Sequence, residues 1–296
     1  MPRSLVVYFS QGGTTARVAE AITAGLRIAG YEVDLSNIKD KQPTDLSSYE
    51  LLGIGSHVNY YRPPFNVTDY LNRLPKLNGL PTFTFLLYGT CPGDSASIIR
   101  RLLARKGARE VGYFHCLGGD YFLGYLKHGY LFSPGHPTER ELDQAKTFGR
   151  EVAAHIGDKH YAIPENDQPF PIIYRLERAV LASRWLGRNV YSRFFKLDAE
   201  KCTRCGVCVK LCPTKNIAGD KTKFPSWGHN CLMCLTCELK CPTDAVRSPI
   251  NWPLFSPFLV YNVHRASRDP SLSYVRVIHN KGHTREVQSG KSEHLE

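Results

Sequence analysis

The chain has 296 residues, 42% hydrophobic and 22% charged, so it is long enough for about two domains with cores of their own and is not largely disordered. It contains no apolar run of the roughly 18 residues that a membrane-spanning helix needs, and its start shows no secretory signal, which favours a cytoplasmic protein. The net charge of +11 favours acidic or anionic partners without selecting among protein, lipid, nucleic acid and small anions.

The N-terminal half alternates short apolar runs with amphipathic segments. The apolar runs predict strands at 5–9, 31–36, 50–56, 80–87 and 110–116, and helical periodicity predicts helices near 14–29, 65–74, 94–106 and 139–156. Thr138 and Glu141 have the spacing of a capping box at the start of the last helix. This alternation predicts an α/β fold with a doubly wound, five-stranded parallel sheet, whose ligand lies at the carboxyl ends of the strands.

The turn after the first strand is rich in small and hydroxyl residues. It consists of Ser10, Gln11, Gly12, Gly13, Thr14 and Thr15. Such a turn places backbone N–H groups and hydroxyls around an anion at the N-terminus of a helix. It lacks the Gly-x-Gly-x-x-Gly pattern of dinucleotide sites and the Gly-Lys-Ser/Thr of a nucleotide-binding P-loop. The turn therefore predicts a phosphate site.

Three turns, each after a strand, together resemble the FMN-binding loops of flavodoxins. They are the phosphate turn, residues 55–64 after the third strand and residues 87–94 after the fourth. The resemblance covers residues 3–157 and implies FMN; a phosphate-binding α/β domain for another ligand is the alternative. Beyond the phosphate turn, the flavin contacts that it implies are Ser56, His57, Val58, Asn59, Tyr60, Tyr88, Gly89, Thr90, Cys91 and Gly93.

The third turn departs from that of carrier flavodoxins, which usually bracket the flavin with aromatic residues in both ring loops. Here Tyr88 is followed by Gly-Thr-Cys-Pro-Gly, which leaves room for a substrate over the ring. His57 and Arg62 are candidate catalytic residues that would bind this substrate. A loop histidine bonded to the backbone and a surface ion pair are the respective alternatives.

A long aromatic segment follows the fifth predicted strand and supplies two more candidate catalytic residues, Tyr125 and His128. Together with Tyr121 and Phe132 they have the spacing of one helix face. Such a face could cover the flavin and hold a planar substrate. Ordinary packing of the aromatic side chains is the alternative.

Residues 161–197 form a predicted linker between two halves of the chain. Pro164, Pro169 and Pro171 mark its start, and residues 172–193 interleave apolar residues with arginines, as a basic amphipathic helix does. We expect this helix to pack between the domains. Docking on an acidic partner, or peripheral contact with anionic lipid, is the less favoured alternative.

Eight of the ten cysteines fall in two runs that repeat at an offset of 29 residues. In each run three thiolates at i, i+3 and i+6 suit one four-iron cluster, and the fourth cysteine, followed by proline, turns to the other cluster. Disulfides and zinc suit these runs less well, because the chain shows no secretion signal and the third cysteine exceeds what zinc needs. The predicted ligand sets are Cys202, Cys205, Cys208 and Cys241 for one [4Fe–4S] cluster, and Cys231, Cys234, Cys237 and Cys212 for the second.

The cysteine segment resembles the bacterial-type two-cluster ferredoxin, and the whole chain resembles flavodoxin–ferredoxin fusion proteins. The expected organisation is a flavodoxin-like domain at 1–160, the linker at 161–197, a small α+β ferredoxin domain at 198–247 and an extension at 248–296 that wraps the surface. Within the extension, residues 248–263 are apolar and interrupted by prolines, so we expect an extended conformation. The tail after about 264 lacks a clear pattern, and we expect part of it to be disordered.

The combination implies an FMN- and iron–sulfur-dependent oxidoreductase. Low-potential electrons from a donor protein, a ferredoxin or a reductase, would pass through the two clusters to FMN, which reduces a small planar or anionic organic substrate. The alternative is a carrier that relays electrons between protein partners, with the basic region 171–212 as its docking face. A redox sensor that binds nucleic acid is disfavoured, because the sequence contains no nucleic-acid recognition motif, and no nucleic-acid partner is expected.

Overall fold

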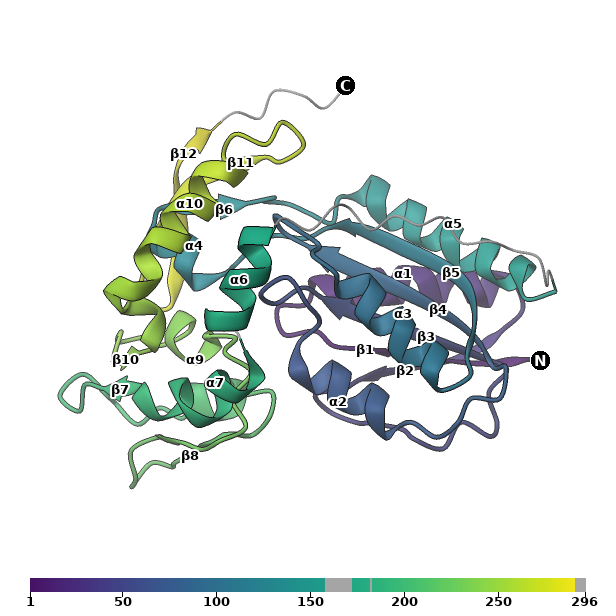
Figure 1. Ribbon diagram of the computed structural model, residues 1–296, viewed down its shortest axis with the longest axis horizontal. Coiled ribbons are helices and arrows are strands. Elements are labelled where there is room, and N and C mark those ends of the chain that lie inside the picture. Colours follow the sequence, from purple (N-terminus) through teal and green to yellow (C-terminus); the bar gives the residue numbers. More distant parts are fainter. Residues whose placement is uncertain (158–171, 182, 291–296) are drawn as a thin grey trace. The chain divides into compact units, whose positions relative to one another are not determined.

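The computed structural model describes residues 1–157, 172–181 and 183–290 (Figure 1). These residues form two compact units, one of residues 1–119 with 135–157 and one of residues 120–134 with 172–181 and 183–290. The second unit therefore includes residues 120–134, which we expected inside the first domain, and residues 172–197, which we expected in a linker. None of the described helices is long and apolar enough to cross a membrane.

The first unit is built around a parallel sheet in the order β2-β1-β3-β4-β5. Its strands are β1 (Arg3–Tyr8), β2 (Glu32–Asn37), β3 (Leu51–His57), β4 (Pro81–Tyr88) and β5 (Arg109–Leu117). Its helices are α1 (Thr14–Ile28), α2 (Phe65–Arg73), α3 (Ser95–Arg105) and α5 (Glu139–His155). Each lies within two residues of its expected position, and the predicted doubly wound fold is confirmed.

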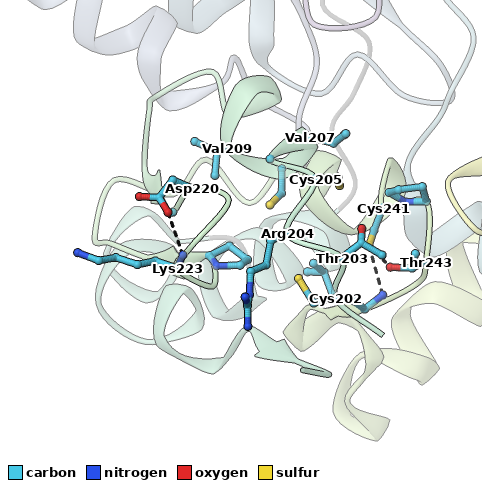
Figure 2. Close-up of a pocket in the computed structure, with 17 residues that line it drawn as sticks. Cys202, Thr203, Arg204, Cys205, Val207, Val209, Asp220, Lys223, Cys241 and Thr243 are labelled. Carbon is cyan, nitrogen blue, oxygen red and sulfur yellow. Dashed lines mark hydrogen bonds between the residues drawn. The ribbon is translucent and has the colours of Figure 1, made fainter. Parts of the chain in front are cut away.

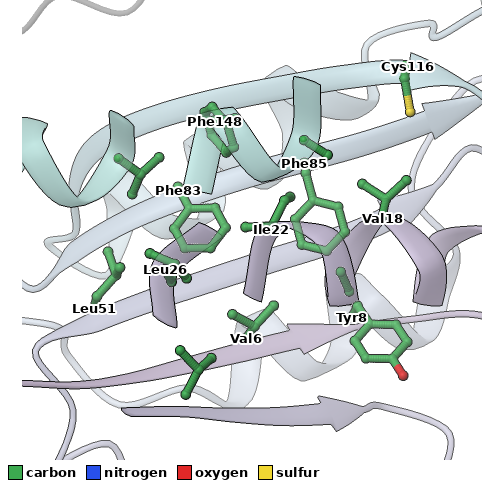
Figure 3. Close-up of a cluster of buried hydrophobic side chains, with 14 of the residues drawn as sticks. Val6, Tyr8, Val18, Ile22, Leu26, Leu51, Phe83, Phe85, Cys116 and Phe148 are labelled. Carbon is green, nitrogen blue, oxygen red and sulfur yellow. The ribbon is translucent and has the colours of Figure 1, made fainter. Parts of the chain in front are cut away.

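The main core of this unit lies between the sheet and the helices α1 and α5 (Figure 3). Phe83 and Phe85 of β4 are fully buried there and meet Ile22 of α1 and Phe148 of α5. The rings of Phe83 and Phe148 make an edge contact with centroids 5.8 Å apart. This packing fixes α1 on the sheet and so fixes the position of its N-terminus at the carboxyl end of β1.

The predicted capping box at the start of α5 is confirmed, and it does more than cap the helix. The Glu141 carboxylate accepts a hydrogen bond from the Thr138 backbone N–H at 2.7 Å, while the Thr138 hydroxyl accepts one from the Glu141 N–H. The same carboxylate also accepts from the Leu117 N–H at 3.2 Å and lies 2.7 Å from Nδ1 of His136. Glu141 thus ties the end of β5 to the start of α5.

Replacement of Glu141 by alanine is expected to lower the free energy of unfolding of the first unit by about 1–3 kcal/mol, because two backbone N–H groups lose their acceptor. Burial raises the pKa of Glu141, but the hydrogen bonds from His136 and Thr138 outweigh it and hold this pKa below its ordinary value. The stabilisation is therefore fully present above the pKa of the unfolded carboxyl and is lost as the pH falls through the lower, folded-state pKa. Denaturant unfolding at pH 7 and at pH 3 measures both effects.

Glu139 provides the matched control, since its exposed carboxylate forms an ion pair with Arg17 at 3.0 Å. Exposed pairs of this kind contribute about 0.2–1 kcal/mol, so Glu139→Ala is expected to change stability little. Equal losses in the two variants at pH 7 would contradict the role assigned to Glu141.

The second unit contains a three-stranded antiparallel sheet in the order β12-β11-β6. The strands are β6 (Tyr130–Phe132), β11 (Tyr274–Asn280) and β12 (His283–Gly290), so a strand from the middle of the chain pairs with the C-terminal hairpin. The expectation of partial disorder after 264 is therefore wrong for residues 274–290.

The aromatic segment after β5 is not one helix, contrary to our prediction. Only α4 (Leu123–Lys127) is helical, and Gly129, at a φ of 82°, turns the chain into β6. Tyr121 and His128 lie outside the helix and Phe132 lies in the strand, so these side chains do not form the expected stripe.

The segment expected to be extended, 248–263, is mostly helical. It forms η2 (Pro249–Asn251), η3 (Pro253–Phe255) and most of α10 (Ser256–Ala266). Pro257 falls in the first turn of α10, where the backbone nitrogen has no intrahelical hydrogen bond to lose. This proline is therefore compatible with a helix, although we interpreted it as a helix breaker.

The expected linker helix is divided. Its described part consists of α6 (Ile172–Leu181), α7 (Arg184–Asn189) and η1 (Tyr191–Phe194), and the three linker prolines lie outside the described residues. Glu177 of α6 is buried and accepts hydrogen bonds from Asn262 of α10 at 3.0 and 3.1 Å. Around the cysteines lie the short elements β7 (Lys196–Leu197), α8 (Val207–Leu211), β8 (Ile217–Ala218), β9 (Ser226–Trp227), α9 (Thr236–Leu239) and β10 (Val246–Arg247).

Candidate metal centre and cofactor site

The two cysteine runs share one backbone conformation. The second residue after the first cysteine is left-handed in both, with φ of 53° at Arg204 and 58° at Met233. The third residue after the last cysteine is left-handed in both, with φ of 52° at Lys215 and at Asp244. The 29-residue repeat in the sequence is therefore also a repeat in the fold.

Each run also directs a backbone N–H group at the sulfur of its last cysteine. The Asn216 N–H donates to Sγ of Cys212 at 3.2 Å, and the Ala245 N–H donates to Sγ of Cys241 at 3.2 Å. N–H···S bonds of this kind stabilise a thiolate, and around iron–sulfur clusters they are among the features that set the reduction potential. This donor arrangement fits a cluster ligand in both runs.

A pocket in the second unit is lined by Cys202, Cys205 and Cys208 of the first run together with Cys241 of the second (Figure 2). Cys205 is exposed, whereas Cys241 is buried. No three His, Cys, Asp or Glu side chains among the described residues converge on the position of a single ion. The assignment to a cluster therefore depends on the motif, the lining of the pocket and the donor bonds.

Two of the other four cysteines, Cys231 and Cys237, have raised pKa values. Burial is the main cause that raises the pKa of Cys231 to about 12 and raises that of Cys237 as well. Neighbouring thiolates of both runs add to these pKa shifts, Cys234 and Cys212 for Cys231, and Cys234, Cys231 and Cys208 for Cys237. Iron binding requires deprotonated thiols, so cluster insertion at these sites releases protons.

Glu238, between two predicted ligands, anchors the segment after β5 to the cysteine region. Its buried carboxylate forms an ion pair with Lys127 of α4 and accepts from the Ser248 N–H at 2.7 Å and from the Asn251 amide at 3.1 Å. This network was not predicted from the sequence, because Lys127 lies 111 residues before Glu238 and no local pattern connects the two.

The phosphate turn lies at the carboxyl end of β1. Gly13 is left-handed with a φ of 92°, and its N–H donates to the Ser10 hydroxyl at 3.2 Å, so α1 begins directly after it at Thr14. The first turn of α1 contains no acidic residue, and a Cβ at Gly12 or Gly13 would meet no atom within 4 Å. An open turn at an uncapped helix N-terminus fits a phosphate.

Asn37, at the end of β2, holds this turn in place. Its side-chain oxygen accepts from the Ser10 N–H at 3.4 Å, and its amide donates to the Ser10 carbonyl at 3.1 Å. Sequence reasoning missed Asn37; the signal was an asparagine that ends the strand next to β1 in a parallel sheet.

The two predicted ring loops, after β3 and after β4, lie against each other. Gly93 has a φ of 58°, and a Cβ on it would lie 2.2 Å from the carbonyl oxygen of Tyr61. Tyr60 and Tyr61 are themselves left-handed, with φ of 51° and 62°. Glycine at 93 therefore allows the two loops to approach, and Tyr61 is a structural residue that our list of flavin contacts did not contain.

His57 ends β3 at the same edge of the sheet. Its ring stacks on that of Phe9 with centroids 5.2 Å apart. Burial lowers the pKa of His57 to about 4, against the opposing effect of a hydrogen bond with the Phe9 backbone, so the ring is neutral at pH 7. The Arg62 guanidinium lies over the ring of Phe65, 4.2 Å from its centroid. At this edge His57 therefore offers a neutral hydrogen-bonding ring and Arg62 a positive charge.

Tyr125 and His128 belong to the second unit, whereas the chain segments that form the flavin loops belong to the first. Tyr125 is 5% exposed and makes edge contacts with the rings of Phe122 and Phe132, and Nδ1 of His128 lies 2.8 Å from the Gly124 carbonyl oxygen. These contacts are those of packing residues, and a catalytic role for either residue stays a prediction.

Comparison with known families finds a match to two parts of the chain. Residues 5–126 match the flavodoxin domain family, and residues 195–218 match the 4Fe–4S binding domain family. Among curated proteins, an uncharacterized protein of Methanocaldococcus jannaschii is 26% identical over 153 residues, covering 51% of this chain and 97% of that protein. The NAD(P)H dehydrogenase (quinone) of Methylocella silvestris is 26% identical over 196 residues, covering 53% of this chain and 98% of that protein.

Solved structures of flavodoxins are also similar to this chain. An archaeal flavodoxin is 21% identical with a TM-score of 0.42, covering 52% of this chain and 98% of its own. The two-electron-reduced flavodoxin of Megasphaera elsdenii is 21% identical with a TM-score of 0.41, covering 51% of this chain and 98% of its own.

Proposed function

We propose that this chain, which joins an N-terminal flavodoxin domain to a ferredoxin-type 4Fe–4S motif, is an iron–sulfur flavoprotein oxidoreductase with one FMN and two [4Fe–4S] clusters. The single observation that carries the proposal is a pocket lined by three cysteines of one run and the last cysteine of the other. This crossed lining is what two clusters with exchanged fourth ligands require. The matching backbone and N–H···S bonds of the second run support the second cluster.

In the flavodoxin domain the turn of residues 10–15 would hold the FMN phosphate, and the loops after β3 and β4 would hold the ring. Bound FMN supplies the exchange between single electrons from the clusters and the two-electron reduction of an organic substrate. The neutral His57 ring would hydrogen-bond that substrate, and Arg62 would attract it if it is anionic. Asn37 and Gly93 would keep the loops in position.

The substrate in this proposal is a small planar or anionic organic compound. Three curated relatives that match about half of this chain are named NAD(P)H dehydrogenase (quinone), so a quinone is the first planar compound to test. The alternative function is a carrier that passes electrons between two proteins and reduces no small molecule. Tyr125 and His128 are secondary candidates for substrate binding, since their contacts are those of packing residues.

The test is an anaerobic reconstitution followed by a stepwise reductive titration. We expect about eight irons and one FMN per chain, and flavin reduction that follows reduction of the clusters. Reoxidation of the reduced flavin by an added quinone or planar anion would support the reductase.

Two results would overturn the proposal: a chain that binds no FMN, or a flavin that stays oxidised while the clusters are reduced. If the flavin is reduced but only a protein acceptor reoxidises it, the carrier is the better description.

A further inference from the structure

The two halves of the cysteine repeat differ in charge. Residues 196–223, around the first run, contain seven basic and three acidic side chains. Residues 224–247, around the second run, balance Lys240 and Arg247 against Glu238 and Asp244. Because the two runs have the same backbone conformation, cluster binding does not by itself require this difference.

Equivalent positions of the repeat show where the charge lies. Arg204 is exposed, whereas Met233, 29 residues later with nearly the same φ, is 5% exposed. Lys210 is exposed, whereas its equivalent Leu239 is 9% exposed. The first run therefore presents cations to solvent at positions where the second run presents apolar side chains to the protein interior.

Two of these cations lie at the pocket of the first run and a third is its neighbour in sequence, and we call Arg204, Lys210 and Lys223 the basic rim. Arg204 and Lys223 line the pocket, and Lys210 directly follows the lining residue Val209. In Figure 2 the side chains of Arg204 and Lys223 extend away from the cysteine sulfurs. Cys205, at the same pocket, is exposed.

One carboxylate, that of Asp220, also lines the pocket, and the carboxylates nearest in sequence have partners other than the rim side chains. Asp220 accepts from the Thr222 N–H at 2.7 Å and the Lys223 N–H at 2.9 Å, and Asp198 pairs with Lys201 at 2.8 Å. Within the described ranges no carboxylate lies within ion-pair distance of a side chain of the basic rim. At the pocket the two lining cations, Arg204 and Lys223, outnumber the one lining carboxylate, Asp220, so the charge next to the exposed ligand Cys205 is net positive.

We propose that the basic rim is the docking surface for an acidic electron-carrier protein, and that electrons cross there to the cluster held by Cys202, Cys205, Cys208 and Cys241. The proposal rests on the proposed function, since it needs that cluster to be present. In the step one electron leaves the reduced centre of the carrier and reduces the oxidised cluster by one, and no proton or other reactant is required.

A protein fits this surface better than a lipid bilayer does. The rim borders the opening of a redox site, and charge complementarity brings a carrier's own centre close to it. The apolar component that membrane insertion needs is small here: Phe224, 38% exposed, lies beneath the Arg204 guanidinium at 4.2 Å.

The experiment compares the wild-type chain with the double variant Arg204→Glu/Lys223→Glu, both loaded with clusters. A reduced, acidic [2Fe–2S] ferredoxin is mixed with each, and the recovery of its own visible bands, which differ from those of a [4Fe–4S] cluster, gives the second-order rate constant. At low salt we expect the variant to be slower by about tenfold or more, because electrostatic steering raises association rates by 10- to 1,000-fold. The wild-type rate should fall as salt is added, and the variant rate should change little.

The matched control is Arg101→Glu/Lys76→Glu, which changes net charge equally at exposed positions of the first unit. It should slow the reaction much less than the rim variant. The reduced methyl viologen cation, which gains nothing from a basic rim, should reduce the clusters of the wild type and the rim variant at comparable rates. Equilibrium binding of the oxidised ferredoxin, measured by calorimetry, should weaken in the same order as the rates.

Oxidation of the ferredoxin is followed on the ferredoxin itself, so failure of this proposal is distinguishable from failure of FMN binding or FMN reduction. Iron content is measured for every variant, and if the glutamate pair loses iron, Arg204→Gln/Lys223→Gln is used, with a smaller decrease expected. An unchanged rate, or equal slowing by the control pair, would overturn the proposal. Loss of binding to phosphatidylserine vesicles with unchanged ferredoxin kinetics would overturn it in favour of a lipid surface.

Discussion

Replacement of Cys241 by alanine is expected to destroy the cluster of the first cysteine run and to leave that of its own run intact. Iron content should fall from about eight to about four per chain, because Cys241 is the fourth ligand at the pocket of Cys202, Cys205 and Cys208. We expect this large loss of iron because one iron of the cluster would no longer have a thiolate ligand from the protein.

Spectra of three variants distinguish the crossed ligand sets from uncrossed ones. With crossed sets, Cys241→Ala and Cys202→Ala should retain the same cluster, with one EPR spectrum, and Cys231→Ala should retain the other. If Cys241→Ala instead matches Cys231→Ala, the ligands are not exchanged between the runs. Cys116→Ala is the control, since this thiol is buried in the flavodoxin core and its removal should leave iron content unchanged.

The second large effect is expected from Gly93→Ala in the loop after β4. Alanine in this left-handed conformation costs about 1–2 kcal/mol, and its Cβ would also collide with the Tyr61 carbonyl oxygen, so the two ring loops must separate. We expect FMN affinity to fall by at least about tenfold, which corresponds to about 1.4 kcal/mol. Quenching of FMN fluorescence on titration with the apoprotein measures it.

The variant Gly79→Ala is the control that distinguishes the effect of backbone strain from the effect of a collision with a neighbouring residue. Gly79 also has a positive φ, of 83°, but a Cβ there meets no atom within 4 Å, and it lies before β4 at the opposite edge of the sheet. Gly79→Ala is expected to lower stability slightly and to leave FMN affinity unchanged. Similar affinities in the wild type and Gly93→Ala would show that the approach of the two loops does not matter for binding.

The first unit could be predicted almost entirely from the sequence, because its signals are local. Each buried strand is a continuous apolar run, and each helix begins after a turn of small or capping residues, as Thr138 and Glu141 show. The order of three loops after three strands then placed the phosphate and ring loops at one edge, since parallel strands end at the same edge. Asn37 was missed there, because its side chain acts by hydrogen bonds to the backbone of a neighbouring loop, which leave no periodic pattern.

The second unit was predicted well only around its cysteines. The spacing of the cysteines is set by iron–sulfur chemistry and can be recognised directly in the sequence. The strands β11 and β12, in contrast, were not predicted. β11 buries only Val277 fully and contains an irregularity between Arg276 and Val277, so the alternation that marks a strand is interrupted. Three-residue β6 is too short for any pattern, and only its pairing with distant residues makes it a strand.

The pairing of β6 with the C-terminal hairpin constrains how the protein is made. Phe132 finds its partner Tyr274 only after the ribosome has added more than 140 further residues. The flavodoxin sheet can form early on the ribosome. The segment between β5 and α5 cannot fold until synthesis is nearly complete, and until then its aromatic side chains are exposed to solvent. For the same reason a cut near residue 160 would not release two independent domains, because the N-terminal fragment would keep residues 120–134, which belong to the second unit.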